Sequence, residues 1–259
     1  MSEGQNTNHG VIVAVTNQKG GVGKTTTAVN TAFYLSKSGK RVLLVDFDPQ
    51  GNATSGLGID KRSLKHTIID VLSGEKSLTD CVISTKYKNL DVLPTTPQLA
   101  NAEVELAKAQ HRFTRLKQGL AKHDYDIVII DCPPSLSLLT VNSLIAARYV
   151  LLPVQAEFYA LEGLGQLLET MQLVRKGLNP QLELMGVVMT MVDARTTLSA
   201  QVQAEVQKHF PGKVFQTIIP RNIRLAEAPS HGLPVGVYDR WSKGARAYKM
   251  LSKEVLQRV

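Results

Sequence analysis

The chain has 259 residues, long enough for one large α/β domain with a buried sheet, and its 43% hydrophobic and 20% charged residues are typical of a globular protein. The net charge of +8, from 30 Lys and Arg against 22 Asp and Glu, favours a polyanionic partner. Cys81 and Cys132 are too few and too isolated for a disulfide framework, which predicts a reducing, cytoplasmic location.

The polar residues 1–10 lack the apolar core of a signal peptide, and we expect them to form a flexible N-terminal tail. No apolar run approaches the roughly 20 residues that span a bilayer. Residues 11–259 contain no repeat, low-complexity segment or interdomain linker, so we expect a single domain.

The apolar run Val11–Val15 predicts a buried strand, and a glycine-rich turn and a helix follow it. This order suits a phosphate chain, because glycines let successive backbone N–H groups point at the anion. Lys24 would bring a positive charge to the terminal phosphates, and the Thr25 hydroxyl would hold Mg²⁺. The usual phosphate-loop pattern has glycine where this chain has Gln18, and a second lysine, Lys19, stands at the start of the loop. We expect the loop to bind nucleotide.

The next apolar run, Val42–Val45, predicts a buried parallel strand with Asp46 and Asp48 at its carboxyl end, where open α/β sheets bind ligands. Asp46 is either a functional acid or a structural carboxylate that anchors the following loop. We expect Gly51–Gly58 to form a loop beside the nucleotide.

His66–Ser73 predicts a short helix, and Leu90–Leu93 predicts another strand. A long helix should follow, with one apolar stripe: Leu99, Ala102, Leu106, Ala109, Phe113, Leu116 and Leu120. The stripe covers only three heptads, which favours packing against the sheet over a coiled coil. The run Ile127–Ile130 then predicts a buried strand that ends at Asp131, a carboxylate suited to bind Mg²⁺ through a water.

Tyr149–Val154 and Leu184–Val192 predict two further strands, and the helix between them has an apolar stripe that begins at Leu161. Thr196 or Thr197 would cap the next helix. A C-terminal amphipathic helix has its own apolar stripe: Trp241, Ala245, Tyr248, Leu251 and Val255. The alternation of strands and helices predicts an α/β fold, a doubly wound, mainly parallel sheet with helices on both faces.

The run Lys19–Thr26 resembles the deviant Walker A motif of the ParA/MinD family of P-loop ATPases. Three further stretches are similar to the ParA (Soj-like) branch, and the resemblance covers nearly the whole chain: Val42–Gly58, Asp126–Pro134 and Val214–Gly232. It implies a P-loop NTPase fold, ATP hydrolysis with ATP and Mg²⁺ as cofactors, and an ATP-dependent homodimer that sandwiches the nucleotides.

The resemblance also implies roles for individual residues. Lys19 reaches across the dimer to the partner's phosphates, Lys24 neutralises the β- and γ-phosphates, and Asp48 positions the attacking water. Thr25 and Asp131 hold the metal, the latter through a water. The loop and an adenine-contacting turn supply the other nucleotide contacts: Gly20, Gly21, Val22, Gly23, Thr26, Pro220, Arg221 and Asn222.

For the whole protein, the resemblance implies an ATPase that partitions a chromosome or a plasmid. The ATP-bound dimer binds DNA without sequence preference, at Arg195 and Arg224 in this chain, and a ParB-like centromere-binding protein stimulates hydrolysis and releases it. The alternative for either arginine is an ordinary ion pair. The resemblance places the protein in the cytoplasm on the nucleoid, without stable membrane association.

Two other functions stay open. A MinD-like ATPase at a membrane surface needs a basic amphipathic C-terminal helix. The last helix carries the required cations: Lys243, Arg246, Lys249 and Lys253. Its apolar stripe is mixed in size and includes Ala245, which favours DNA partitioning. A metabolic or iron–sulfur ATPase is disfavoured, because Cys81 and Cys132 lie in unrelated segments without a Cys-x-x-Cys.

Overall fold

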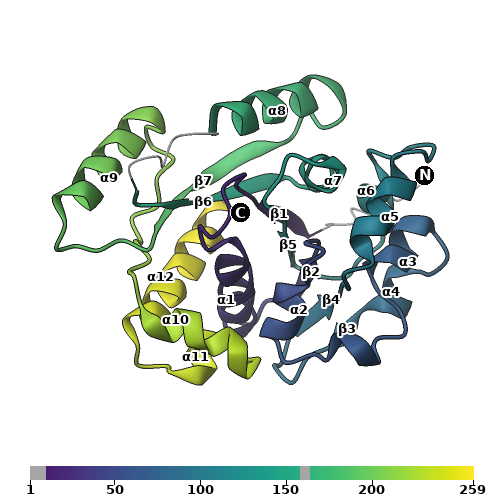
Figure 1. The fold of residues 1–259 in the computed structure, drawn as a ribbon, viewed down its shortest axis with the longest axis horizontal. Helices are drawn as coiled ribbons and strands as arrows, with labels where there is room; N and C mark the ends of the chain where they lie inside the picture. The colour runs from purple at the N-terminus through teal and green to yellow at the C-terminus, as the bar shows by residue number, and fades with distance from the viewer. Residues whose placement is uncertain (1–9, 158–163) are drawn as a thin grey trace, which may run out of the picture.

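A seven-stranded sheet in the order β3-β4-β2-β5-β1-β6-β7 runs through the computed structural model, which describes residues 10–157 and 164–259 (Figure 1). Neighbouring strands are parallel except β3 and β4. The strands are β1 (Val11–Val15), β2 (Val42–Asp46), β3 (Ile83–Ser84), β4 (Leu90–Leu93), β5 (Ile127–Asp131), β6 (Tyr149–Gln155) and β7 (Glu183–Thr190).

Helices cover both faces of this sheet (Figure 1). The α-helices are α1 (Lys24–Lys37), α2 (Asn52–Gly56), α3 (Ile68–Ser73), α4 (Leu78–Cys81), α5 (Leu99–Leu106), α6 (Arg115–Gly119), α7 (Leu138–Ala146), α8 (Leu164–Gly177), α9 (Thr197–His209), α10 (Ile223–Glu227), α11 (Val235–Tyr238) and α12 (Lys243–Arg258). Two 3₁₀ turns, η1 (Lys61–Ser63) and η2 (Ala228–His231), complete the elements. The predicted mainly parallel, doubly wound α/β fold is confirmed.

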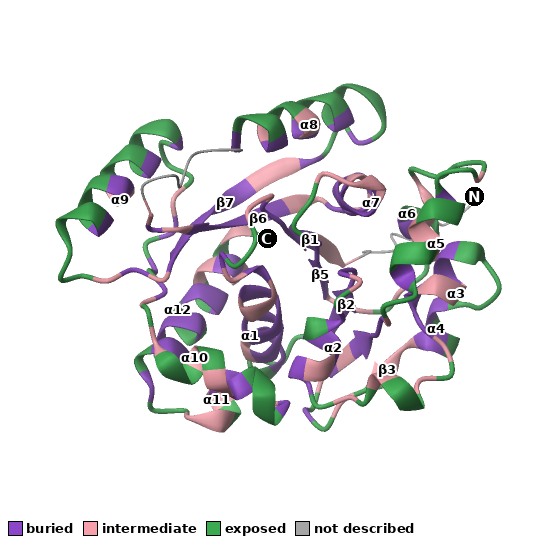
Figure 2. Ribbon diagram, viewed as in Figure 1, coloured by how far each residue is buried: buried purple, intermediate pink, exposed green. Residues whose placement is uncertain are grey.

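The central strands are buried on both faces and therefore contribute side chains to two hydrophobic cores, one on each side of the sheet. In β5, Val128 and Ile130 pack in the core beneath α3 to α9, whereas Ile127 and Ile129 pack with α1 and α12. Figure 2 shows this contrast, with the strands buried and the outer surfaces of α8 and α9 exposed. Burial on both faces explains why these strands are continuous apolar runs in the sequence.

The strand order brings the predicted site together. β5 lies between β1 and β2, so the loop after β1 and the carboxyl ends of β2 and β5 meet at one edge of the sheet. Asp131 is paired in register with Val15 on one side and with Asp46 on the other. This edge is where ligands of parallel α/β sheets bind.

Most of the predicted elements are present. Each predicted strand occurs, although β7 ends at Thr190 rather than Val192. The short helix α3 is capped by Thr67 and ends at Gly74, whose φ of 82° favours glycine. Thr196, not Thr197, caps α9, and its Oγ1 accepts a hydrogen bond from the Ser199 N–H at 3.3 Å.

The prediction of one long helix across Leu99–Leu120 is wrong. The segment forms α5 and α6, which are separated by turns that include His111 at a φ of 58°. Asn142 of α7 explains the break, because its side chain forms hydrogen bonds with two backbone groups that would pair with each other in a continuous helix. Its Nδ2 donates to the Arg112 carbonyl at 2.8 Å, and its Oδ1 accepts from the Leu116 N–H at 3.3 Å. Because the long helix does not form, the coiled-coil alternative is excluded as well.

Three smaller expectations also need correction or fall outside the structure. Gly51–Gly58 is not only a loop, since α2 occupies most of it. Trp241 precedes α12 and is 71% exposed, so it does not belong to the buried stripe. Leu161 and residues 1–9 of the predicted tail lie outside the described residues.

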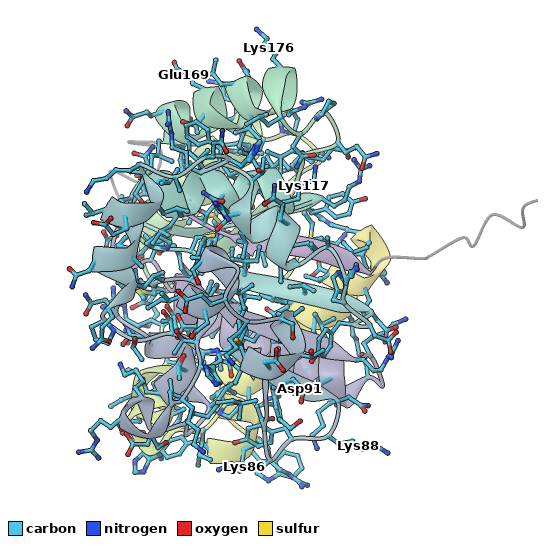
Figure 3. The ribbon with its side chains drawn as sticks, turned by 90° about the vertical axis from the view of Figure 1, so that its right-hand side faces the viewer. Lys86, Lys88, Asp91, Lys117, Glu169 and Lys176 are labelled. Carbon is cyan, nitrogen blue, oxygen red and sulfur yellow. The ribbon has the colours of Figure 1, made fainter. Side chains whose placement is uncertain are left out.

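The positive charge is spread over the surface. Figure 3 shows labelled lysines far apart on one face, with Lys176 of α8 at one end, Lys117 of α6 in the middle, and Lys86 and Lys88 near β4 at the other end. Net charge alone therefore does not single out a binding surface. No helix in the described ranges is both long and apolar enough to cross a membrane.

Candidate active site

The loop after β1 has the backbone geometry that its glycines predict. Gly21 and Gly23 have φ angles of 75° and 87°, which L side chains rarely adopt. Asn17 fixes the start of the loop, because its Nδ2 donates to the Pro153 carbonyl at 2.7 Å and its Oδ1 accepts from the Lys19 N–H at 3.0 Å. The loop is therefore tied to the neighbouring strand β6 and opens directly into α1.

Lys24 is buried at the first position of α1. Its Nζ donates to the Lys19 carbonyl across the loop at 2.9 Å. Burial lowers the pKa of Lys24, and the nearby carboxylates of Asp131 and Asp48 act in the opposite direction. A phosphate in the loop would offer this buried ammonium a negative partner in direct contact, which no ion pair supplies within the described residues.

Asp131 is the most unusual carboxylate of the site. Burial, and secondly the neighbouring Asp46, raise its pKa well above the usual range, while the Thr25 hydroxyl and the Lys24 charge oppose this shift. The Thr25 hydroxyl is near enough to act on the pKa, but neither oxygen of Asp131 has a hydrogen bond of normal geometry within the described residues. A buried carboxylate without a partner needs a cation or its hydration water, so the residues present fit a hydrated Mg²⁺.

Asp46 is the last residue of β2 and Asp48 lies in the turn after it, but their surroundings differ. Asp46 is fully buried and accepts hydrogen bonds from the N–H and the Oγ1 of Thr54 at 2.7 and 2.6 Å. Burial nevertheless raises its pKa to about 6. Asp48 accepts a hydrogen bond from the Gln50 N–H at 2.9 Å and lines the cavity described next.

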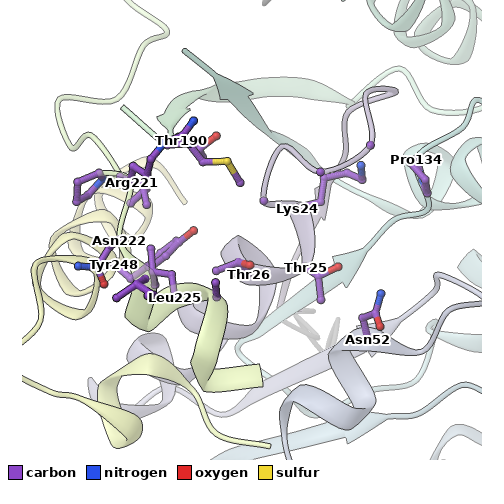
Figure 4. A pocket seen from close by; sticks show the side chains of 18 of the residues that line it. Lys24, Thr25, Thr26, Asn52, Pro134, Thr190, Arg221, Asn222, Leu225 and Tyr248 are labelled. Atoms are coloured by element: carbon purple, nitrogen blue, oxygen red, sulfur yellow. The ribbon is translucent and has the colours of Figure 1, made fainter. Parts of the chain in front are cut away.

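A cavity of about 650 Å³ runs from the phosphate loop to the segment around α10 (Figure 4). This volume lies within the range of sites that hold small-molecule ligands. Its two ends differ in chemistry. One end carries the ammonium of Lys24, the hydroxyl of Thr25 and the side-chain amide of Asn52. The other end is formed by β7, the turn before α10, α10 itself and α12: Thr190, Arg221, Asn222, Leu225 and Tyr248.

The predicted adenine-contacting turn forms the second end of this cavity. Pro220, Arg221 and Asn222 all line it. The turn is fixed beside the end of β7, because the Arg221 N–H donates to the Val192 carbonyl at 3.0 Å. The buried Oδ1 of Asn222 has no hydrogen-bond partner in the described part of the chain, so it can accept from an amine such as that of adenine.

Sequence reasoning missed the role of Tyr248 in this site. The sequence predicts it in the apolar stripe of the last helix, and it is almost fully buried there, yet its side chain also lines the cavity. Its Oη lies 3.1 Å from the Oγ1 of Thr27, in the helix that follows the phosphate loop. Only the packing of α12 on α1 reveals this contact.

Two of the predicted loop residues do not line the cavity. The Nζ of Lys19 forms an ion pair with the Oε2 of Glu157 in the same chain at 2.9 Å, and both side chains are partly exposed. Val22 is buried, and its carbonyl accepts a hydrogen bond from the Thr190 Oγ1 at 2.8 Å. Lys19 therefore points away from its own loop.

The two predicted DNA-binding arginines lie outside the cavity, and each forms an ion pair. Arg195 follows β7 and donates to both carboxylate oxygens of Asp193, at 2.9 and 2.7 Å, while its side chain stays 87% exposed. Arg224 of α10 lies 2.9 Å from Glu227 and 3.4 Å from Asp239. Exposed pairs of this kind are weak, so the arginines remain accessible to a stronger anion.

Comparison with known proteins supports the interpretation of the motifs. A family model described as an AAA domain matches residues 10–184. The chain is 56% identical over 248 residues to the sporulation initiation inhibitor protein Soj of Bacillus subtilis, covering 95% of this chain and 98% of that protein. It is 49% identical over 251 residues to the chromosome partitioning protein ParA of Caulobacter vibrioides, covering 95% and 94%.

Solved structures share the fold at lower identity. Cobyrinic acid a,c-diamide synthase of Mycobacterium smegmatis, with bound ADP and magnesium, superposes with a TM-score of 0.84 at 39% identity and covers 96% of this chain and 94% of its own. The septum site-determining protein MinD of Pyrococcus horikoshii, complexed with Mg-ADP, gives a TM-score of 0.78 at 27% identity and covers 95% of each chain.

Proposed function

Since the chain belongs to the Soj/ParA family of chromosome-partitioning ATPases, we propose that it hydrolyses ATP and that its ATP-bound homodimer binds DNA without sequence preference. One observation carries the enzymatic part of this proposal. Lys24, Thr25 and Asp48 line the phosphate end of a single cavity, and Asp131 ends the strand between β1 and β2. These are the groups that phosphoryl transfer to water needs.

ATP and Mg²⁺ are the cofactors, as the magnesium and nucleotide in the solved structures of similar proteins support. Thr25 would hold the metal through its hydroxyl, and Asp131 would hold it through a water, which would give that orphaned carboxylate its missing partner. Mg²⁺ supplies charge neutralisation at the terminal phosphates. The loop amides and Lys24 bind the phosphate chain, and Pro220 to Asn222 contact the adenine.

Hydrolysis itself is mostly a matter of position and charge. Asp48 accepts a hydrogen bond from the attacking water and orients it towards the γ-phosphate. Lys24 stabilises the charge that spreads over the transferred group and the leaving oxygen. Both side chains are nearly buried, at 7% and 6% exposure, so their interactions with the substrate are only weakly screened by solvent.

Lys19 would act in the other subunit of a dimer. In the single chain it is engaged with Glu157 and does not reach its own cavity. Breaking this partly exposed pair costs no more than about 1 kcal/mol, which the phosphates of a partner readily offset. Hydrolysis should therefore depend on dimerisation.

Arg195 and Arg224 would contact DNA phosphates in that dimer, and a ParB-like centromere-binding protein would stimulate hydrolysis and release it. Under this proposal the protein works in the cytoplasm on the nucleoid. The MinD-like alternative is weaker, because the apolar stripe of α12 packs against α1 and is not available to enter a bilayer: Ala245, Tyr248, Leu251 and Val255. Among the described residues of α12, Met250 is the one large apolar side chain that is mostly exposed. MinD is also the more distant relative, at 27% identity.

The experiment is a measurement of ATP hydrolysis together with binding to random duplex DNA in ATP, in ADP and without nucleotide, each across a salt series. We expect tight, salt-sensitive binding only with ATP. Co-sedimentation with vesicles of anionic phospholipid, in the same three states, tests the MinD-like alternative. DNA affinity that is equal in all three states would refute the proposed function.

A further inference from the structure

The buried carboxylate of Asp46 has no part in the phosphoryl-transfer chemistry set out above, yet it holds the turn that carries Asp48. Its Oδ2 accepts both the N–H and the hydroxyl of Thr54, the third residue of α2. Its Oδ1 lies 3.4 Å from the Asp48 N–H, at the beginning of the turn. One carboxylate therefore touches both ends of the segment between β2 and α2.

The rest of the turn is fixed around this carboxylate. Gly51 has a φ of 63° and donates its N–H to the Asp48 carbonyl at 2.8 Å. The Asp48 carboxylate accepts from the Gln50 N–H at 2.9 Å. A second strand takes part, because the N–H of the fully buried Thr95, just past β4, donates to the Thr54 hydroxyl at 3.2 Å. The Thr54 hydroxyl thus links the ends of β2 and β4.

We propose that Asp46 and Thr54 are positioning residues, which set the place of the Asp48 carboxylate relative to the phosphate loop. This inference rests on the proposed function, because it presumes that Asp48 orients the attacking water. Buried hydrogen bonds to an ionised carboxylate are short and strong, and the two from Thr54 have this character. A displacement of about 1 Å at a catalytic group lowers turnover by up to about 100-fold.

The sequence leaves open whether Asp46 is a functional acid or a structural carboxylate that anchors the following loop. Its hydrogen bonds to Thr54 favour the anchoring role, and we infer that this anchoring positions Asp48 in the site. Asp46 is the last residue of β2, in register with Asp131 and two residues before Asp48. Any movement of the Asp46–Thr54 contact shifts the chain between them, and Asp48 lies in that chain.

Thr54→Val is the informative variant. It keeps the shape of the side chain and the backbone N–H that binds Asp46, but it removes the hydroxyl. Asp46→Ala is less useful, because it would leave the buried N–H and hydroxyl of Thr54 without their acceptor and risks unfolding. Thr31→Val is the matched control, since Thr31 is also fully buried and its hydroxyl has no hydrogen-bond partner in the described residues.

The measurements are kcat for ATP hydrolysis in the full-length protein and the Kd for ATP, both well below the unfolding temperature. We expect Thr54→Val to lower kcat at least about tenfold with a Kd within about twofold of the parent. Thr54→Ser restores the hydroxyl and should recover most of the rate, and Thr31→Val should match the parent. Asp46→Asn, which retains one acceptor oxygen, should lower kcat in the same way.

The outcomes separate this inference from the function on which it rests. An active parent together with a Thr54→Val variant of equal kcat would overturn the positioning role and leave the proposed function standing. Equal losses in Thr54→Val and Thr54→Ser would also overturn it, because the hydroxyl would then not be the cause. A parent without ATP turnover would overturn both.

Discussion

Replacement of Arg195 by alanine is the sharpest test of the proposed DNA surface. Among the described residues this guanidinium binds Asp193 alone, and 87% of its side chain is exposed. The chain offers a close control, because Arg62 binds Asp60 through the same pair of atoms, Nε and Nη2, and is 91% exposed. Both arginines lie two residues after their acid. Arg62→Ala therefore removes an equivalent ion pair, but at a position with no proposed DNA contact.

The expected magnitude follows from the number of phosphate contacts. A dimer presents Arg195 twice, and each neutralised phosphate contributes about 0.9 to the slope of log affinity against log salt, so the variant should lose about 1.8 from that slope. Between 50 and 200 mM salt, the parent's affinity should then fall about tenfold more than that of the variant. The pair with Asp193 is exposed to solvent on the arginine side and therefore weak, so it does not mask the effect.

Fluorescence anisotropy with a random duplex and saturating ATP measures these slopes. Arg195→Ala and Arg224→Ala should weaken binding to all sequences alike and keep ATP-induced dimerisation, because neither residue lines the nucleotide cavity. Arg62→Ala should keep the parent's slope. If both variants bind as tightly as the parent with the same slope, the DNA surface lies elsewhere, and the exposed cations of α12 become the next candidates: Lys243, Arg246 and Lys249.

Three further predictions concern the nucleotide site. Lys19→Ala should still bind ATP through Lys24 and the loop amides. Its steady-state rate of hydrolysis should fall at least about 100-fold, because the variant lacks the positive charge supplied in trans. An unchanged rate would contradict the cross-dimer role. Asp48→Ala should bind ATP and accumulate as a dimer on size exclusion, and a variant that stays monomeric with ATP would point to a structural role instead. Tyr248→Phe removes the contact with Thr27 but keeps the packed ring, so the free energy of unfolding should fall by about 1 kcal/mol and the Tm by about 2–4 °C in thermal denaturation. A loss several times larger would show that the ring itself is displaced.

The strands and the phosphate loop could be predicted because their determinants are local. Val13–Val15 and Ile127–Ile130 are buried on both faces, and burial of that kind leaves an uninterrupted apolar run in the sequence. Gly21 and Gly23 are required at their positions by positive φ angles. The predicted helix across Leu99–Leu120 failed for the opposite reason, because the side chain that ends it, Asn142, comes from another helix.

The same distinction divides the candidate site. Lys24, Asp48 and Asp131 could be proposed from the sequence because each lies at, or within two residues of, the end of a glycine-rich turn or a buried strand. Thr54 and Tyr248 could not, since a threonine in a polar segment and a tyrosine in an amphipathic helix have many possible roles. Their importance depends on what packs against them, namely the carboxylate of Asp46 in one case and the phosphate-loop helix in the other. No spacing in the sequence reports such contacts.

The two lysines of the phosphate loop show how its geometry would make activity depend on assembly. They are five residues apart, yet the Lys24 ammonium turns back across the loop to the Lys19 carbonyl, whereas the Lys19 ammonium turns outwards to Glu157. Under the proposed function, the loop presents Lys24 to its own phosphates and Lys19 outwards, where the phosphates of an identical chain facing the same edge of the sheet would replace the weak pair with Glu157. The opposite directions of the two ammonium groups would then favour hydrolysis in the dimer over hydrolysis in the single chain.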